Sequence, residues 1–586
     1  MASTTRTHEK PSEIPPSSLL GPPSVTSSSE LSYSNDEERS SLDGCFDGDH
    51  VLGDYHDITS TRDLQIQTTN ERPTTTSVRK EFQAKAQDFK ILLREVTKMI
   101  LDYYDACGRP TETQLHASYS MPEQILERLG GSLPLTSESE SSNNNDTGNE
   151  ACLKDLEVCF QYSLKTMHPF FFDKLYFGTD PIGQIAELVI AVLNGNTHVY
   201  HVSPVFSLME VEIIQWMGQQ FGFSKEHIEG TLNPGGSMSN LMALLLARNE
   251  HFPHVKKQGW ARNDRPVAFT AVQSHYSVST AAMVTGMGSD QMIQVPANRE
   301  TSQMDPVALE ECIQKELSKG NKPFFVNAVA GSTVMGAFDD LKAISKICKR
   351  YGLWFHVDAC WGGFLIFAKN NPKGRSLLEG VEQADSISFN PHKGLGIPQQ
   401  CSMLITNNKK DAFIRSNGTS AEYLYGRTGY DLGDKTLGCG RRADALKFWL
   451  SIRKHGVGKF QQIADNELEK AEHMTNLVRE SPDFELVAEP MATTVCYWYT
   501  PKYFQLHPEE YTEELKAKVH KLIFHRMKLF GRCLIQQNPL AEFQLPNFFR
   551  LALGADRTRL EDMAFLLEET RRLGQEITPI DLDSSK

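Results

Sequence analysis

The chain has 586 residues, of which 40% are hydrophobic and 23% charged, a composition typical of globular proteins that excludes collagen-like, coiled-coil and wholly disordered classes. Sixty basic against 74 acidic residues give a formal net charge of −14, which opposes nucleic-acid binding, so no nucleic-acid partner is expected. No apolar run approaches the roughly 18 residues of a membrane helix and no signal peptide is recognised, so we expect no membrane association and a cytoplasmic location.

The N-terminal region divides into a polar tail and a helical arm. Residues 1–30 contain 17 Ser, Thr or Pro, and residues 1–80 carry 13 acidic against 7 basic side chains, so residues 1–77 are predicted to form a disordered tail. Apolar residues then recur at helical spacing from Val78 to Gly108, which predicts a helical arm over residues 78–165. Residues 137–150 contain no apolar side chain and are predicted to be a flexible insertion in that arm.

The central part of the chain alternates short β-rich runs with helical patterns. The apolar runs that predict buried strands are residues 267–272, 324–330, 354–360, 386–390 and 401–406. Between the second and third, a helix is predicted from Asp339-Asp340-Leu341 through Arg350, with acids at its start and bases at its end. The alternation predicts an α/β domain with a mostly parallel sheet over residues 166–443.

The C-terminal part becomes strongly helical after Asp444. It also contains a β-like run at Val495–Tyr499 and a predicted final helix near Arg557–Leu573. Residues 444–586 are therefore predicted to form a smaller α+β domain.

The 11 cysteines are scattered, without a C-x-x-C pair or the spacing of zinc ligands, and their odd number argues against a closed set of disulfides. We expect reduced thiols, most of them buried, because free cysteine is among the most buried residue types. No metal site is expected.

Two charged residues follow neighbouring predicted strands. Asp358 ends the strand His356-Val-Asp358, and Lys393 stands beside His392 in a Gly- and Pro-rich turn after the next strand. Sheets of this class bind ligands at the carboxyl ends of their strands. A lysine and a carboxylate so placed are the two charged contacts that pyridoxal phosphate needs, since the lysine forms a Schiff base and the carboxylate pairs with the ring nitrogen.

Three motifs give the chain its resemblance to a known family. They are Asn-Pro-His-Lys393 followed by G-x-P-x-Q-C, the strand HVDA-x-WGG from His356, and NFFR from Asn547 to Arg550. These motifs resemble those of the group II pyridoxal-phosphate decarboxylases, and among them the glutamate and cysteine-sulfinate decarboxylase branch. The resemblance extends from about Val78 to the C-terminus. The resemblance implies a fold-type I, aspartate-aminotransferase-like α/β architecture. It also implies a homodimer with active sites at the subunit interface.

The resemblance also implies a cofactor site, residue by residue. Gly236 and Ser237 would hold the phosphate at a helix N-terminus, His275 would stack on the ring, and Asp339 would support Thr333 near the cofactor. The implied cofactor contacts are Gly236, Ser237, His275, Thr333, Asp358, His392, which would contact the phosphate, and Lys393.

A tyrosine is implied as the acid that returns a proton to Cα of the substrate. Tyr423 is the candidate and Tyr425 the alternative, beside a Gly-rich stretch from Gly426 to Gly440 that suits a lid. The implied catalytic residues are Lys393, Tyr423, Asp358 and His275, and Arg550 would pair with the α-carboxylate of the substrate.

The substrate-binding stretch departs from the family. The family's HPRFFNQLS-x-G-x-D reads HPFFFDKLYFGTD from His168 to Asp180, so Lys174 replaces a Gln that recognises a distal carboxylate, and Tyr176 and Phe177 narrow or aromatise the pocket. Tyr200 is like the cysteine-sulfinate and aspartate branch, although the sequence is shifted from the family's at His201.

The substrate expected from these residues is a small acidic amino acid: glutamate, aspartate or cysteine sulfinate. Tyr176 and Phe177 leave open an aromatic or non-standard amino acid. An inactive scaffold protein is a further alternative, against which the joint presence of Lys393, Asp358 and His275 argues.

Overall fold

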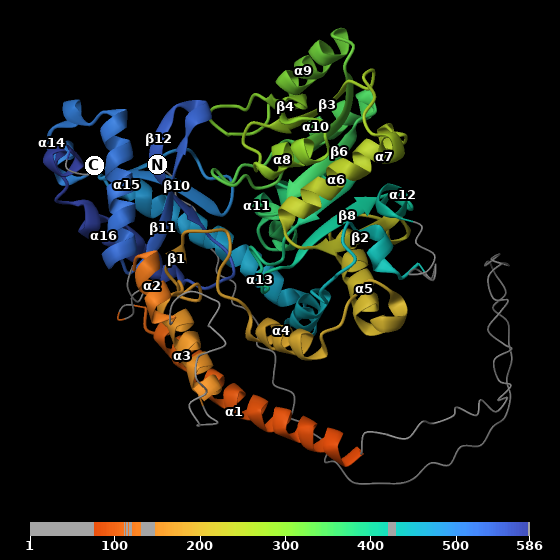
Figure 1. Ribbon diagram of the computed structural model, residues 1–586. Helices are drawn as coiled ribbons and strands as arrows, with labels where there is room; N and C mark the ends of the chain where they lie inside the picture. Colours follow the sequence, from red (N-terminus) through yellow and green to blue (C-terminus); the bar gives the residue numbers. More distant parts are fainter. Residues whose placement is uncertain are drawn as a thin grey trace, which may run out of the picture. The chain divides into compact units, whose positions relative to one another are not determined.

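The computed structural model describes residues 75–110, 112, 115, 120–129, 147–419 and 429–583 (Figure 1). Contacts divide the chain into two units, Met1–Lys80 and Glu81–Lys586. Of the first unit only residues 75–80 are described, and they begin helix α1 (Thr75–Cys107). The predicted tail lies almost wholly outside the described residues, as does most of the predicted insertion at 137–150.

Three helices occupy the region predicted to be a helical arm. They are α1, α2 (Pro122–Arg128) and α3 (Thr147–Tyr162). The ring centroids of Tyr103 on α1 and Phe160 on α3 lie 5.9 Å apart. The Tyr104 hydroxyl donates to Gln184 Oε1 over 3.0 Å, which connects α1 to α4 (Pro181–Leu193).

A seven-stranded sheet forms the centre of the larger domain, in the order β2-β8-β7-β6-β5-β3-β4. Its strands are β2 (Ile228–Asn233), β3 (Pro266–Ala271), β4 (Met292–Val295), β5 (Lys322–Val329), β6 (Trp354–Ala359), β7 (Ser386–Phe389) and β8 (Ser402–Asn407). Strands β3 to β7 pair in parallel, and β8 is antiparallel to both neighbours. The mostly parallel sheet predicted from the apolar runs is confirmed.

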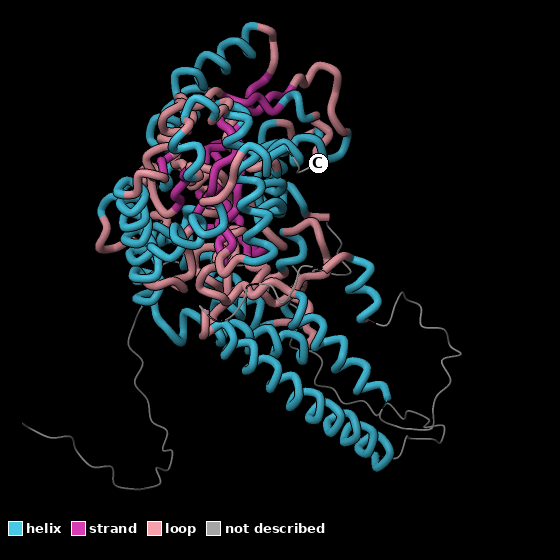
Figure 2. The backbone as a smooth tube through the Cα atoms, turned by 90° about the vertical axis from the view of Figure 1, so that its left-hand side faces the viewer, coloured by secondary structure: helices cyan, strands magenta, loops and turns pink. Residues whose placement is uncertain are grey.

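Helices cover this sheet, whose strands lie in the interior in Figure 2. Besides α4 they are α5 (Pro204–Gln220), α6 (Gly236–His251), α7 (Val255–Gln258), α8 (Ser277–Val284), α9 (Pro306–Ser318), α10 (Leu341–Tyr351), α11 (Pro372–Ser376) and α12 (Ala412–Asn417). The predicted helix is α10. Asp340 caps it by accepting from Ala343 N over 2.9 Å, and Gly352 ends it at φ +64.

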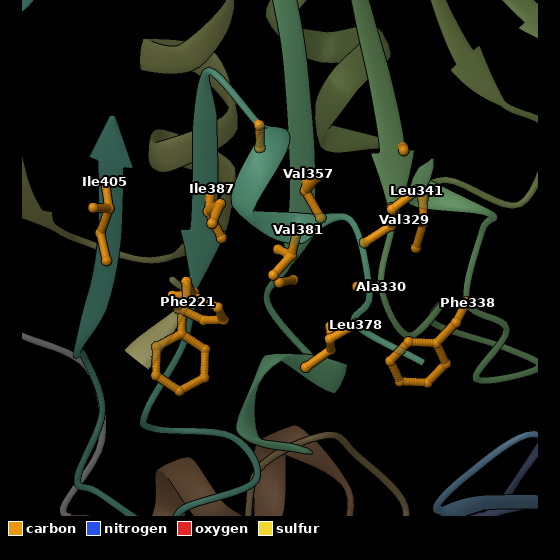
Figure 3. Close-up of a cluster of buried hydrophobic side chains, with 14 of the residues drawn as sticks. Phe221, Val329, Ala330, Phe338, Leu341, Val357, Leu378, Val381, Ile387 and Ile405 are labelled. Atoms are coloured by element: carbon orange, nitrogen blue, oxygen red, sulfur yellow. The ribbon is translucent and has the colours of Figure 1, made fainter. Parts of the chain in front are cut away.

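Buried apolar side chains fix the positions of the strand ends. Val329, Val357 and Ile387 come from adjacent strands and are at most 4% exposed (Figure 3). Burying each such side chain contributes roughly 1.5–3 kcal/mol. Because Asp358 follows Val357 directly, this packing also fixes where Asp358 lies.

The C-terminal domain contains a second sheet, in the order β1-β11-β12-β10-β9. Its strands are β1 (Phe171–Phe172), β9 (Phe484–Leu486), β10 (Thr494–Tyr499), β11 (Leu534–Leu540) and β12 (Leu545–Ala552). Its helices are α13 (Ala445–Glu480), α14 (Lys502–Leu506), α15 (Glu513–Phe530), α16 (Met563–Gly574) and α17 (Pro579–Asp583). The short 3-10 helices among the described residues are η1 (Tyr200–Val202), η2 (Lys225–His227), η3 (Ser289–Gln291), η4 (Gly362–Phe367), η5 (Val381–Gln383), η6 (Leu432–Lys435), η7 (Pro508–Glu510), η8 (Ala541–Phe543) and η9 (Leu560–Asp562).

Two boundaries differ from the sequence-based prediction. Strand β1 pairs in parallel with β11, so a segment after residue 166 belongs to the C-terminal sheet, because Phe170–Phe172 are buried in its core. The helix predicted near Arg557–Leu573 is α16, which begins at Met563 and is followed by α17, while the Arg557 guanidinium donates to the carbonyls of His168 and Phe171 at 2.8 Å. Among the described helices, none has both the length and the apolar character needed to cross a bilayer.

Candidate active site

The predicted cofactor residues converge at the carboxyl ends of adjacent parallel strands. His275 follows β3, Thr333 follows β5, Asp358 lies in β6 and Lys393 follows β7. Pairing of Val329 with Asp358, and of Asp358 with Ser388, keeps these strand ends in register. This edge of a parallel sheet is where such folds bind ligands.

Asp358 is an ionised carboxylate in the interior of the site. It is 6% exposed, and it accepts from Asn240 Nδ2 over 2.8 Å and from Cys360 N over 3.1 Å. Burial acts to raise the pKa of Asp358, but the nearby Lys393 charge and these donors together lower it below its ordinary value. The negative charge is therefore available to a cationic partner.

Lys393 presents an amine to the same space. Its backbone N–H donates to Asn390 O over 3.0 Å, and the carbonyl of Gly394 accepts from Ala555 N over 2.9 Å, which ties the turn to the C-terminal domain. The side chain is half-buried, and within the described part of the chain its amine makes no hydrogen bond or ion pair. An amine so placed is free to react.

His275 follows β3, which β5 separates from β6, and its imidazole is neutral. Its Nδ1 lies 2.9 Å from Ser277 Oγ, and burial lowers the pKa of His275, with the nearby charges of Asp358 and Lys393 acting in opposite directions. The ring also lies against Tyr276, at 4.3 Å between centroids.

The N-terminus of α6 forms a cradle beside these residues. Gly235 has φ +95, in the region that favours glycine, and no side chain caps the helix. A Cβ at Gly236 would lie 2.7 Å from Cys360 Sγ and 2.8 Å from Asn390 Nδ2, so only glycine allows this close approach. Uncapped amides at a helix N-terminus suit a phosphate, and Ser237 follows in the same turn.

His392 is buried beside this turn. Its Nδ1 lies 2.6 Å from the carbonyl oxygen of Cys401, and burial lowers the pKa of His392 to about 4. Cys401 N also approaches this Nδ1, at 3.1 Å, so both backbone polar groups of Cys401 contact the same edge of the ring. A separate cavity of about 380 Å³ adjoins the loop before α6, but neither Asp358 nor Lys393 lines it.

Asp339 shapes the turn that carries Thr333. Its carboxylate accepts from Met304 N and Val329 N, both over 2.7 Å, and burial raises the pKa of Asp339 to about 6. Arg550, 4% exposed, donates to the carbonyls of Thr333 over 2.7 Å and Asp173 over 3.0 Å. Arg550 thus joins this turn to the predicted substrate stretch.

The substrate stretch lies beside the Lys393 turn, since Asp180 N donates to Gly396 O over 3.0 Å. Lys174 is exposed, and its Nζ lies 3.1 Å from Asp173 Oδ2. Tyr176 is half-buried, with its ring centroid 6.0 Å from that of Phe171.

The Phe177 side chain is buried by interior packing. It is 4% exposed, its ring lies 6.1 Å from that of Trp361, and the Arg557 guanidinium lies 4.4 Å over it. An aromatic ring at this position is held by interior packing, because Trp361, Ala552 and Arg557 enclose it.

The contacts of Tyr200 do not join it to this cluster. Tyr200 N donates to Asp431 Oδ1 over 2.9 Å, and its ring lies 5.6 Å from that of Tyr430. Tyr423 and Tyr425 lie outside the described residues, which end at 419 and resume at 429.

Known proteins resemble this chain in sequence and in structure. A family model described as the pyridoxal-dependent decarboxylase conserved domain matches residues 133–500. The crystal structure of mouse CSAD, cysteine sulfinic acid decarboxylase, is 32% identical in sequence, has a TM-score of 0.77, and covers 83% of this chain and 99% of its own. The chain belongs to the pyridoxal-phosphate-dependent decarboxylases.

Other solved members share its fold. A structure of Oryza sativa TDC with PLP and tryptamine is 23% identical with a TM-score of 0.74, and covers 86% of this chain and 99% of its own. The glutamate decarboxylase domain of a Vibrio parahaemolyticus enzyme is 23% identical with a TM-score of 0.69, and covers 83% and 96%. The decarboxylase therefore has the fold-type I architecture, is an amino-acid lyase, and uses pyridoxal phosphate.

The residues at the strand ends fit that cofactor. An ionised carboxylate, a free amine and an uncapped helix N-terminus match the ring nitrogen, the aldehyde and the phosphate of pyridoxal phosphate. Asp358, Lys393 and Gly236 supply these three features within one strand-end cluster.

Sequence reasoning missed the polar residues that support this cluster in the decarboxylase. Asn240 and Ser277 contact Asp358 and His275, and His356 contacts Asn240. One signal was available, since Asn240 is a polar residue four positions after Gly236, on the same face of the helix, directly before the apolar run 241–247.

Proposed function

We propose that this decarboxylase acts on a small acidic L-amino acid, glutamate, aspartate or cysteine sulfinate, and releases carbon dioxide and an amine. The observation that carries the proposal is the 32% identity to mouse cysteine sulfinic acid decarboxylase over 83% of this chain and 99% of that one. Lys174 in the predicted substrate stretch supports it, as does Arg550, which donates to the carbonyl of Asp173.

The cofactor contacts are part of the same proposal. Lys393 would anchor the cofactor covalently, Asp358 would pair with the ring nitrogen, and His275 would stack on the ring. Bound pyridoxal phosphate supplies an electron sink for the electron pair left when the α-carboxylate departs. Further contacts are assigned to Gly236, Ser237 and His392 at the phosphate and to Thr333 beside the cofactor.

Two residues would handle the proton chemistry. The ionised Asp358 would hold a proton on the ring nitrogen, because a buried carboxylate favours a cationic partner. Tyr423 would return a proton to Cα of the substrate, with Tyr425 as the alternative donor.

Arg550 and Lys174 would bind the two ends of the substrate, with Tyr200 as a further substrate contact. Both Nη atoms of Arg550 are held on backbone carbonyls, while its buried Nε has no hydrogen-bond partner in the described residues. A fixed, incompletely satisfied cation suits the α-carboxylate. Lys174 pairs with Asp173 in the structure, so a distal carboxylate would compete with Asp173 for it.

An aromatic or non-standard amino acid is the second candidate. Tyr176 favours it, because this aromatic side chain is half-buried in the substrate stretch. Phe177 gives no such support, since its ring packs in the interior. An inactive scaffold is not supported, because the chain belongs to an enzyme family and contains Lys393, Asp358 and His275.

A panel of amino acids separates the two candidates. The protein loaded with pyridoxal phosphate is incubated with the twenty standard amino acids and cysteine sulfinate, and amines are detected by mass spectrometry. The proposal expects amines from acidic substrates, with little product from tryptophan, tyrosine or phenylalanine. Aromatic amines as the main products would overturn the acidic assignment and leave the enzyme class intact.

A homodimer is also proposed, supported by helix α4. Five large apolar side chains on this 13-residue helix are 37–64% exposed: Ile185, Leu188, Val189, Val192 and Leu193. A helix that is apolar on its outer face needs a partner, and a second copy of the chain would supply one. Light scattering should give twice the chain mass of 65.9 kDa, and Val192→Asp should lower the measured mass.

A cytoplasmic location stays a prediction.

A further inference from the structure

Asn240 lies at the centre of a buried hydrogen-bond chain that links two proposed cofactor contacts. It is 3% exposed on α6, and its Nδ2 donates to Asp358 Oδ2 over 2.8 Å and to Ser277 Oγ over 3.1 Å. Both amide hydrogens are therefore committed. One reaches the carboxylate of β6, and the other reaches the start of α8 next to His275.

The direction of the first branch follows from the charge of Asp358. An ionised carboxylate only accepts, so the amide nitrogen must face it and Asn240 Oδ1 must face His356 Nε2, 3.2 Å away. His356 is fully buried, and burial lowers its pKa to about 4, so the ring is neutral. Its single proton therefore lies on Nε2.

The far end of this branch agrees with that tautomer. With the proton of His356 on Nε2, its Nδ1 must accept from Ser386 Oγ, 2.8 Å away. The Ser386 oxygen in turn accepts from Trp354 Nε1 over 2.8 Å. Each hydrogen bond of the chain from Trp354 to Asp358 is thus donated in the direction of Asp358.

The second branch fixes the tautomer of His275. Ser277 Oγ accepts from Asn240, so its hydroxyl hydrogen is free to donate to His275 Nδ1 over 2.9 Å. Ser277 N also donates to this Nδ1 over 3.3 Å. Two donors on one ring nitrogen require a lone pair there, which leaves the His275 proton on Nε2.

We propose that Asn240 is a positioning residue that couples Asp358 to His275, holding the carboxylate ionised and the imidazole neutral through one amide. The proposal rests on the proposed cofactor roles of these two residues. A protonated His275 could not accept from Ser277, and a second positive charge stacked on the ring would oppose a proton on the ring nitrogen. The single amide therefore favours both charge states that an electron sink needs.

The first test measures cofactor binding rather than turnover. Asn240→Leu keeps the shape and removes both donors, so the pKa of Asp358 should rise. The equilibrium dissociation constant for pyridoxal phosphate, measured from its visible absorption, should increase roughly tenfold at pH 7, and more at pH 5.5, relative to the unmodified protein. No change, or the same fold-change at every pH, would overturn the coupling.

Asn327→Leu is the matched control. Asn327 is a fully buried asparagine on β5 of the central sheet. Its Nδ2 donates to Thr270 and Ser274, not to Asp358. The affinity of this control for pyridoxal phosphate should depend on pH as that of the unmodified protein does. His356→Gln supplies an amide N–H where the ring had its Nε2–H, and it should restore most of the affinity that His356→Leu loses.

The second test needs neither a folded variant at position 240 nor the cofactor. Nitrogen NMR of the histidine-labelled apoprotein at pH 7 should show both His275 and His356 as neutral Nε2–H tautomers, assigned by the signals lost in His275→Gln and His356→Gln. An Nδ1–H tautomer at either residue would overturn the directional chain. A protein that showed these tautomers but bound no pyridoxal phosphate would contradict the proposed function alone.

Discussion

Asp358 and Lys393 carry opposite charges at the ends of adjacent strands, and their roles differ. Asp358 is held by two donors in the interior, whereas the Lys393 amine is free within the described chain. The carboxylate is therefore suited to a permanent contact, and the amine to a bond that forms and breaks.

The charge of Asp358 is open to a direct test. Asp358→Asn keeps the shape but cannot hold a proton on the ring nitrogen, and it loses a charge-assisted contact of about 1.5–3 kcal/mol. We expect the rate of amine formation to fall roughly 10- to 100-fold, and cofactor affinity to fall as well. Steady-state assays at saturating pyridoxal phosphate measure the first effect. Full activity with bound cofactor would show that this carboxylate is dispensable.

Substitutions of Lys174 test whether the substrate is acidic. Lys174→Gln restores the residue of the family pattern, and losing a charge-assisted contact should lower kcat/KM for the preferred acidic substrate about tenfold. Lys174→Glu should be worse, because it opposes two negative charges. Lys349→Gln, at an exposed lysine on α10, is the control and should leave kcat/KM unchanged. An unchanged kcat/KM in Lys174→Glu would remove Lys174 from the substrate pocket.

At the scale of elements, the start of α6 is closely packed against Cys360 and Asn390. Gly236→Ala would place a Cβ 2.7 Å from Cys360 Sγ and 2.8 Å from Asn390 Nδ2, so either the helix N-terminus or these two buried side chains must shift. We expect a tenfold or greater loss of cofactor affinity. Gly458→Ala on α13, where a Cβ meets nothing within 4 Å, should bind normally. Equal affinities for the two variants would contradict the phosphate cradle.

Elements differ in how far the sequence predicted them. Strands β3 and β5 to β8 were predicted, because their apolar runs are bounded by turns, whereas β2 and β4 have shorter or more polar runs. Strand β1 was missed because its pairing with β11, far along the chain, defines it.

The site divides in the same way. Lys393 and Asp358 were predicted because each ends or follows a recognisable strand, whereas His275 was implied by the family resemblance, and the structure places all three at carboxyl ends of the parallel strands. Asn240 was not assigned a role, because its importance depends on contacts with β6 and α8 that no local pattern encodes. Likewise, no local pattern shows that the Phe177 ring packs against Trp361.

At the scale of the whole molecule, buried neutral histidines make the fold sensitive to acid. His520 is fully buried, accepts from Tyr499 N over 3.0 Å, and has a pKa lowered to about 4, mainly by burial. The unfolded chain binds a proton at this residue near pH 6.5, so its contribution is present above that pH and is lost as pH falls towards 4.

Urea unfolding at pH 7 and pH 5 measures this sensitivity. The free energy of unfolding should fall between these values, and His520→Gln should remove about one proton from the slope, about 1.4 kcal/mol per pH unit. His525→Gln, an exposed histidine on the same helix α15, should keep the slope. A slope unaffected by His520→Gln would mean that this residue does not titrate on unfolding.

The central claim is that Lys393, Asp358 and the start of α6 form one pyridoxal-phosphate site that decarboxylates an acidic amino acid. Release of labelled carbon dioxide from glutamate, aspartate and cysteine sulfinate carrying carbon-13 in the α-carboxylate tests it most directly. We predict labelled carbon dioxide and amine in equal amounts from at least one of these, and none from Lys393→Ala, which should also lose the visible cofactor band. Unlabelled carbon dioxide, or equal release by Lys393→Ala, would contradict the account.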